Sequence, residues 1–129
     1  MNVKKIIFTD KAPAPIGPYN QAVLVNETTL YTSGQIALHP QTMELVLDDI
    51  ETETKQVMEN MKAVLEAANM TFEQVVKTTI FIMDMNDFAR INTVYGSYFD
   101  EKTAPARETV QVACLPKNVN VEISMIAVK

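Results

Sequence analysis

The sequence is poor in the residues that metal, disulfide and thiol chemistry require. Its 129 residues include one His, one Cys, no Trp and only three Gly. The single Cys114 excludes an intramolecular disulfide and zinc sites built from several cysteines. The single His39 excludes the two-histidine motifs of zinc proteases and non-haem iron centres. We therefore expect no metal and no cofactor, and Cys114 with His39 is the one thiol–imidazole pair that the chain allows.

The chain is also short of positive charge and of long apolar runs. Its 11 basic residues stand against 16 acidic ones, which gives a net charge of −5. Nucleic-acid binding depends on a Lys/Arg surface, so we expect no nucleic-acid partner. No apolar run approaches the ~18 residues of a membrane span, and residues 1–10 lack the longer apolar run of a signal peptide. We expect a single domain over residues 1–129, cytoplasmic and not bound to a membrane.

The order of the expected elements is β, β, β, α, β, α, β, β. Apolar residues at helical spacing mark two helices, and β-branched runs mark the strands. The expected strands are 4–9, 19–25, 28–33, 75–83, 107–115 and 119–128, and the expected helices are 48–68 and one that is capped by Asn86 or Asp87 and broken at 103–106.

This order predicts an α+β fold with two helices packed on one face of a mixed sheet. The two strand–helix–strand crossovers make part of the sheet parallel. A chain of this length has no further element to cover the other face. Partner subunits are the simplest cover, so we expect a homo-oligomer.

Glu122 is the first candidate catalytic residue because it interrupts the apolar strand 119–128. Strict alternation places Val121 and Ile123 on one face, and Glu122 and Ser124 on the other. The carboxylate is either on a solvated face or partly buried. If it is buried, the loss of solvent raises its pKa and suits it to proton transfer.

Arg107 is the candidate counterpart. It follows Pro105 and opens the strand 107–115, where a guanidinium can hold a carboxylate in a bidentate fork. The alternative is a surface Arg in a weak ion pair. Arg107 and Glu122 lie on consecutive strands, which allows a contact between them but fixes neither the register nor the subunit.

Further candidate residues lie outside the two expected helices. Gly34 follows Ser33 at the end of a strand and indicates either a bulge or a close approach of the backbone to another group. Tyr19 follows a rigid proline-rich segment, which either holds the phenol at a fixed place or leaves it as an ordinary packed Tyr. Cys114 is expected to be an inert core thiol, and His39 is expected to be exposed.

The chain also carries short motifs whose order and spacing are more specific than any one of them. They are Ala12-Pro-Ala-Pro-Ile-Gly-Pro-Tyr19, Thr32-Ser-Gly-Gln35, Asn60-Met-Lys-Ala63, Val76-Lys-Thr-Thr-Ile-Phe-Ile82, Asn86-Asp-Phe-Ala89, Asn92, Pro105-Ala-Arg107, Leu115-Pro-Lys117 and Val121-Glu-Ile123. Together they resemble the reactive intermediate deaminase (Rid, formerly YjgF) family over nearly the whole chain.

The resemblance implies a chorismate-mutase-like α+β fold and a homotrimer with ligand sites in the clefts between subunits. It also implies a cofactor-free hydrolysis of small 2-imino acids or their enamine tautomers, such as 2-iminobutanoate and 2-iminopropanoate, to 2-oxo acids and ammonia. In this family's pattern, Arg107 clamps the substrate carboxylate, and Glu122 activates the attacking water and passes protons to the departing nitrogen. The pocket is shaped and supported by Tyr19, Ser33, Gly34 and Asn92.

The sequence departs from the family pattern after Arg107, where the family usually has Ser-Cys and this chain has Glu108 and Thr109. Thr109 is expected on the same strand face as Arg107, where its hydroxyl takes the place of a thiol. Glu108 is expected on the opposite face; if it turned inward, it would compete with the substrate carboxylate. Met43 and Asn69 stand where the family has turn glycines.

Two other functions stay open at this stage. The first is a non-catalytic 2-oxo acid binding or sensor protein that uses the same Arg107. The second is RNA cleavage or translational inhibition, against which the acidic composition counts.

Overall fold

The computed structural model describes residues 3–129, and its six strands form one sheet. Residues 1 and 2 lie outside the described residues, and the expectation about a signal peptide partly concerns them. The elements are β1 (Lys4–Ile7), β2 (Ala22–Val25), β3 (Thr29–Thr32), α1 (Ile50–Ala67), β4 (Val75–Ile82), α2 (Phe88–Gly96), β5 (Ala106–Gln111) and β6 (Val121–Val128), with short 3₁₀ helices at Phe72–Gln74, Met85–Asp87 and Pro116–Asn118. The predicted order is confirmed, although several elements are shorter than expected.

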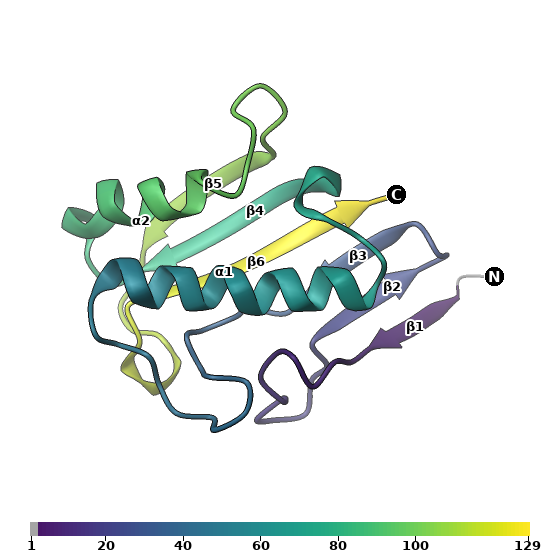
Figure 1. The fold of residues 1–129 in the computed structure, drawn as a ribbon, viewed down its shortest axis with the longest axis horizontal. Helices are drawn as coiled ribbons and strands as arrows, with labels where there is room; N and C mark the ends of the chain where they lie inside the picture. Colours follow the sequence, from purple (N-terminus) through teal and green to yellow (C-terminus); the bar gives the residue numbers. More distant parts are fainter. Residues whose placement is uncertain (1–2) are drawn as a thin grey trace.

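The strands run in the order β1-β2-β3-β6-β4-β5 across the sheet. Only β4 and β5 pair in parallel; the other neighbours are antiparallel. Because β6 is antiparallel to both β3 and β4, the crossover through α1 connects strands that point the same way. The crossover through α2 connects the parallel neighbours β4 and β5. Figure 1 shows both helices on one face of the sheet. The predicted α+β fold with a mixed sheet is confirmed.

Helix α1 begins where the sequence supplies a cap and ends where the backbone turns left-handed. The Asp49 side chain accepts a hydrogen bond of 2.7 Å from the Thr52 amide. Beyond the helix, Asn69 has a φ of 59°, a conformation that Asn tolerates better than most residues. The apolar side of the helix between these ends packs on the sheet, and its fully buried residues are Val57, Met58, Met61, Val64 and Leu65.

The start of α2 differs from the expectation. Asp84, rather than Asn86 or Asp87, supplies the capping carboxylate, which accepts a hydrogen bond of 2.9 Å from the Asn86 amide at the start of the 3₁₀ turn. The Asp87 side chain makes no capping bond. The helix ends at Gly96, well before the segment 103–106 that was expected to break it.

The face of the sheet opposite the helices carries apolar side chains. Val110 pairs with Phe81 across β4 and β5, and Tyr31 pairs with Ile126 across β3 and β6. Val110 is 41% exposed and Tyr31 is 49% exposed. In the described chain, 3–129, neither helix is long and apolar enough to cross a membrane.

Candidate functional site

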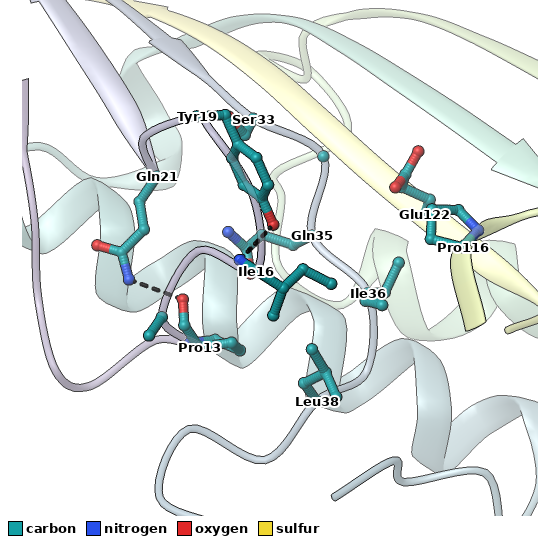
Figure 2. A pocket seen from close by; sticks show the side chains of 12 residues that line it. Pro13, Ile16, Tyr19, Gln21, Ser33, Gln35, Ile36, Leu38, Pro116 and Glu122 are labelled. Atoms are coloured by element: carbon teal, nitrogen blue, oxygen red, sulfur yellow. Dashed lines mark hydrogen bonds between the residues drawn. The ribbon is translucent and has the colours of Figure 1, made fainter. Parts of the chain in front are cut away.

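A pocket of about 330 Å³ opens beside β6, with Glu122 in its wall. Its other walls come from the proline-rich segment 13–19, from residues 33–38 and from Pro116. We call this the Glu122 pocket. Figure 2 shows Glu122 and Pro116 on one side of it and Tyr19 and Ser33 on another. Residues far apart in the sequence therefore form one concave surface.

Gly34 lies directly against Glu122. A Cβ atom at Gly34 would lie 2.7 Å from Glu122 Cδ and 2.9 Å from Cγ, so there is no room for a larger residue while Glu122 keeps its place. The next residue also contacts β6. The Gln35 backbone amide donates to the Ile123 carbonyl at 2.8 Å, and the Gln35 backbone carbonyl accepts from the Ile123 amide at 3.1 Å. Of the two interpretations of Gly34, the close approach of the backbone is confirmed.

Glu122 is half-buried, on the face predicted by the strand alternation. Burial disfavours the charged form and raises the pKa of its carboxyl above the ordinary 4.5. Among residues 3–129, no group donates a hydrogen bond to this carboxylate. It is therefore a desolvated carboxylate that is free to accept a proton from a molecule in the pocket.

The proline-rich segment holds Tyr19 at the mouth of the pocket. The Tyr19 hydroxyl accepts a hydrogen bond of 3.3 Å from the Ile16 amide, and the Tyr19 amide donates to the Gly17 carbonyl at 2.8 Å. Tyr19 remains 45% exposed, so it is a positioned phenol rather than an ordinary core residue. Ser33 donates its hydroxyl hydrogen to the Asn20 carbonyl at 2.6 Å, which ties the two walls together.

Arg107 lies on the other side of the sheet, against α2. One guanidinium nitrogen donates to Asn92 Oδ1 at 2.6 Å. Its central carbon lies 5.1 Å from the Tyr95 ring centroid and 5.6 Å from that of Phe88, both within cation–π range. The buried Tyr95 in turn donates its hydroxyl hydrogen to Thr78 Oγ1 at 3.0 Å. The guanidinium is therefore held on three sides.

The two residues that depart from the family pattern point as expected. Thr109 lines the same site as Arg107, and its buried hydroxyl oxygen has no hydrogen-bond partner among residues 3–129. Glu108 points to the opposite face and pairs with Lys77 at 2.6 Å, which lowers the pKa of the Glu108 carboxyl. Glu108 therefore does not occupy Arg107. We call Phe88, Asn92, Tyr95, Arg107 and Thr109 the Arg107 cluster.

The Glu122 pocket and the Arg107 cluster do not meet within one chain. Arg107 pairs with Thr78 of β4, which is buried beneath the helices, whereas Glu122 pairs with Phe81 on the opposite face. In addition, β4 lies between β5 and β6. Strands β5 and β6 follow one another in the chain but are not neighbours in the sheet. The contact that the sequence allows between Arg107 and Glu122 is therefore absent within one chain.

The aromatic partners of Arg107 were not predicted, and one thiol lies elsewhere than expected. Phe88 and Tyr95 are spaced as i and i+7 with Asn92 between them, so that all three share one face of α2, and this spacing is the signal that could have indicated them. Cys114 is exposed rather than a core residue, because β5 ends at Gln111.

His39 is half-buried rather than exposed, and its Nδ1 accepts a hydrogen bond of 3.1 Å from the Gln41 amide. Elsewhere in the described residues, no three His, Cys, Asp or Glu side chains gather as metal ligands would.

Comparison with known proteins identifies the family of the chain. The family model described as Endoribonuclease L-PSP matches residues 9–129. A RutC family protein of Synechocystis is 58% identical over 96% of this chain and 95% of its own. The mouse protein named 2-iminobutanoate/2-iminopropanoate deaminase is 47% identical over 98% of this chain and 93% of its own.

Solved structures agree with this result. The crystal structure of Escherichia coli TdcF with bound serine is similar to this structure with a TM-score of 0.90 and 47% identity, over 97% of this chain and 98% of TdcF. The chain therefore belongs to the Endoribonuclease L-PSP family, which is the Rid/YjgF family that its motifs resemble.

Proposed function

We propose that the protein hydrolyses 2-imino acids or their enamine tautomers, such as 2-iminobutanoate and 2-iminopropanoate, to 2-oxo acids and ammonia without a cofactor. The observation that carries this proposal is the state of Arg107. It is fixed by Asn92 and two rings, and among residues 3–129 no carboxylate lies within ion-pair distance of it. Its remaining N–H groups suit the carboxylate that every 2-imino acid carries.

Two relatives support this class of substrate. The mouse relative bears the name of a deaminase for these two imino acids, and the E. coli relative was crystallised with serine, which carries a carboxylate beside a nitrogen-bearing carbon. The Glu122 pocket, at about 330 Å³, is large enough to admit a small molecule of this kind.

The complete site is proposed to form between subunits of a homotrimer. Arg107 and Glu122 lie on opposite faces of one chain, so one ligand reaches both only if a second chain supplies one of them. The exposed apolar side chains on the face that carries Glu122 favour such a partner. A closed ring of three identical contacts then creates three equivalent sites.

The proposed reaction requires only water and proton transfer. Arg107 holds the carboxylate of the N-protonated (iminium) form, and Glu122 takes a proton from water as the water oxygen bonds to C2 and the C=N electron pair moves to nitrogen. The protonated Glu122 then returns this proton to nitrogen, and the C–N bond breaks with its electron pair on the departing ammonia. The Glu122 carboxylate takes up the hydroxyl proton as the C=O bond forms and later releases it to solvent. An enamine first takes a proton at C3, which converts it to the same iminium form.

The physical properties of Glu122 suit this role. A carboxyl whose pKa is raised by burial is a better base than an exposed one and is more easily reprotonated near neutral pH. Positioned acid–base catalysis contributes a factor of about 10²–10⁴. Thr109, in the Arg107 cluster, and Tyr19, at the Glu122 pocket, are proposed to contact the ligand. Ser33, Gly34 and Asn92 are proposed to hold the side chains around them in position.

Ammonia release tests the proposal. Threonine dehydratase generates 2-iminobutanoate in situ, and its disappearance is followed with and without the protein. Acceleration together with ammonia release supports the enzyme. Binding of 2-oxobutanoate without acceleration supports the sensor alternative instead. Cleavage of RNA that persists at moderate salt would support the nuclease that the family description names, for which a net charge of −5 is unfavourable.

A further inference from the structure

Glu53 is a buried carboxylate that the proposed mechanism does not use. It lies in the first turn of α1, where an acidic residue is expected to face solvent, yet it is 0% exposed. Its side chain turns toward the sheet and accepts three hydrogen bonds. Oε2 accepts from the Asn120 amide at 2.7 Å and the Val121 amide at 3.3 Å, and Oε1 accepts from Asn120 Nδ2 at 2.8 Å.

The partners of Glu53 are unusual because none of them is a cation. The ion pairs within residues 3–129 involve other carboxylates. A buried carboxylate is costly unless hydrogen bonds replace its hydration, and an apolar side chain of similar volume would often stabilise the fold as well. Glu53 therefore contributes something that an apolar residue could not: a fixed attachment between α1 and the backbone at the start of β6.

This attachment ends one residue before Glu122. The Asn120 peptide is held from the other side as well, since its carbonyl accepts a hydrogen bond of 3.0 Å from the Met83 amide. Beyond Glu122, the Ile123 peptide is held by the pair of hydrogen bonds with Gln35. The backbone of Glu122 is thus fixed on both sides, and its side chain is confined by Gly34.

We propose that Glu53 is a positioning residue for Glu122: by holding the amides of Asn120 and Val121 to α1, it fixes the direction in which the Glu122 carboxylate enters its pocket. Glu53 itself touches no substrate. The proposal rests on the proposed deaminase function for its kinetic consequences, and its structural consequence is measurable without activity.

The kinetic test compares Glu53→Ala with Glu53→Gln. Glu53→Ala removes the attachment between α1 and the start of β6 and is expected to lower kcat about 10- to 100-fold. A displacement of the Glu122 carboxylate by about 1 Å has an effect of this order. The Kd of 2-oxobutanoate should change little, because Arg107 is unaffected. Glu53→Gln should retain most of kcat, because its carbonyl oxygen accepts from the two amides and the Asn120 side-chain amide can reverse to match the new NH₂ group.

A double-mutant cycle separates positioning from general destabilisation. If Glu53 acts through Glu122, Glu53→Ala should add almost nothing to the rate loss of Glu122→Gln. The matched control is Val64→Ala, a core truncation farther along the same helix, about 16 Å away at 1.5 Å per residue. It should lower the Tm while leaving kcat unchanged. Equal kcat losses in Glu53→Ala and Val64→Ala, or additive losses in the cycle, would overturn the proposal.

A titration distinguishes this failure from failure of the deaminase function. Carbon-13 NMR of the Glu122 carboxyl, assigned by its disappearance in Glu122→Gln, needs no turnover. Glu53→Ala should move the Glu122 pKa toward its ordinary value as the strand start loosens and admits water, whereas Glu53→Gln should not. An unchanged Glu122 titration in folded Glu53→Ala would contradict the proposal, whether or not the wild-type protein releases ammonia.

Discussion

Arg107 and Glu122 point to opposite faces of the same sheet, and strand β4 lies between the strands that carry them. Each has a property that one half of the proposed reaction needs: Arg107 is held in place and keeps unused N–H donors, and Glu122 is partly desolvated and accepts no hydrogen bond from residues 3–129. Neither half is sufficient alone.

Glu122→Gln should lower kcat by a factor of about 10²–10⁴, because the amide cannot accept and return a proton. Its shape is nearly unchanged, so the Kd of 2-oxobutanoate should stay within a few-fold of the wild-type value. Stopped-flow loss of 2-iminobutanoate and calorimetric titration of the 2-oxo acid measure the two quantities. Wild-type kcat in Glu122→Gln would remove Glu122 from the mechanism.

Arg107→Ala should abolish turnover through lost carboxylate binding, and Arg107→Lys should raise KM strongly. Lysine is a point charge that cannot reproduce the fork or stack between Phe88 and Tyr95 in the same way. Arg90→Lys is the matched control, since Arg90 lies on α2 but pairs with Glu51 on the surface. Similar KM values for the two lysine variants would show that the Arg107 fork is not used.

Gly34→Ala should lower kcat with little loss of stability. The new methyl group would lie 2.7 Å from Glu122 Cδ, and the flexible Glu122 side chain would move aside. A displacement of about 1 Å costs about 10²-fold in rate. A methyl group at Gly96 meets nothing within 4 Å, so Gly96→Ala should keep kcat and gain about 0.5–1 kcal/mol. Equal kcat in the two variants would mean that the Gly34 contact has no role in catalysis.

The pH–rate profile should show an acid limb that belongs to Glu122. The base must be ionised, and burial raises its pKa above 4.5, so kcat should fall as the pH drops through a midpoint above that value. The limb should disappear in Glu122→Gln. A midpoint at or below 4.5 would indicate that Glu122 is not desolvated when the enzyme works.

The raised pKa of Glu122 also predicts that the fold is less stable at neutral pH, where activity requires the ionised carboxylate. A carboxyl whose pKa is higher in the folded than in the unfolded state stabilises the fold at a pH below its unfolded-state pKa. This stabilisation is lost as the pH rises through the folded-state pKa. At neutral pH, Glu122→Gln should therefore have a higher Tm than wild type, and the difference should close below pH ~4. A lower Tm at neutral pH would contradict this assignment.

The sequence predicts the layers of this fold and most of the site, but not how the site is divided. Hydrophobic periodicity places α1 and β6 correctly because their buried faces are continuous. The motifs select Arg107, Glu122 and Gly34 as candidate site residues; the structure places Glu122 and Gly34 around one pocket and Arg107 in a separate cluster. The sheet order is not encoded locally: β6 inserts between β3 and β4, and this long-range pairing separates Arg107 from Glu122.

The prediction for Cys114 is wrong because the end of a strand is hard to locate in a sequence. The apolar run around Cys114 suggests a longer strand, but β5 stops at Gln111 and the thiol is exposed. The burial of Glu53 has a different cause. Its sequence context is that of any acidic residue in a first helical turn, and only tertiary packing turns its side chain toward Asn120.

Subunit complementation tests most directly whether each active site takes Arg107 from one chain and Glu122 from another. Arg107→Ala and Glu122→Gln chains, each inactive alone, are mixed at equal ratio, unfolded and refolded together. In a closed trimer, about three quarters of the assemblies are mixed, and each has one intact site in three, so activity should recover to about one quarter of wild type. The double variant mixed with wild type provides the control for refolding yield. If mixed assemblies form and activity stays at the level of the separate variants, the composite site is contradicted.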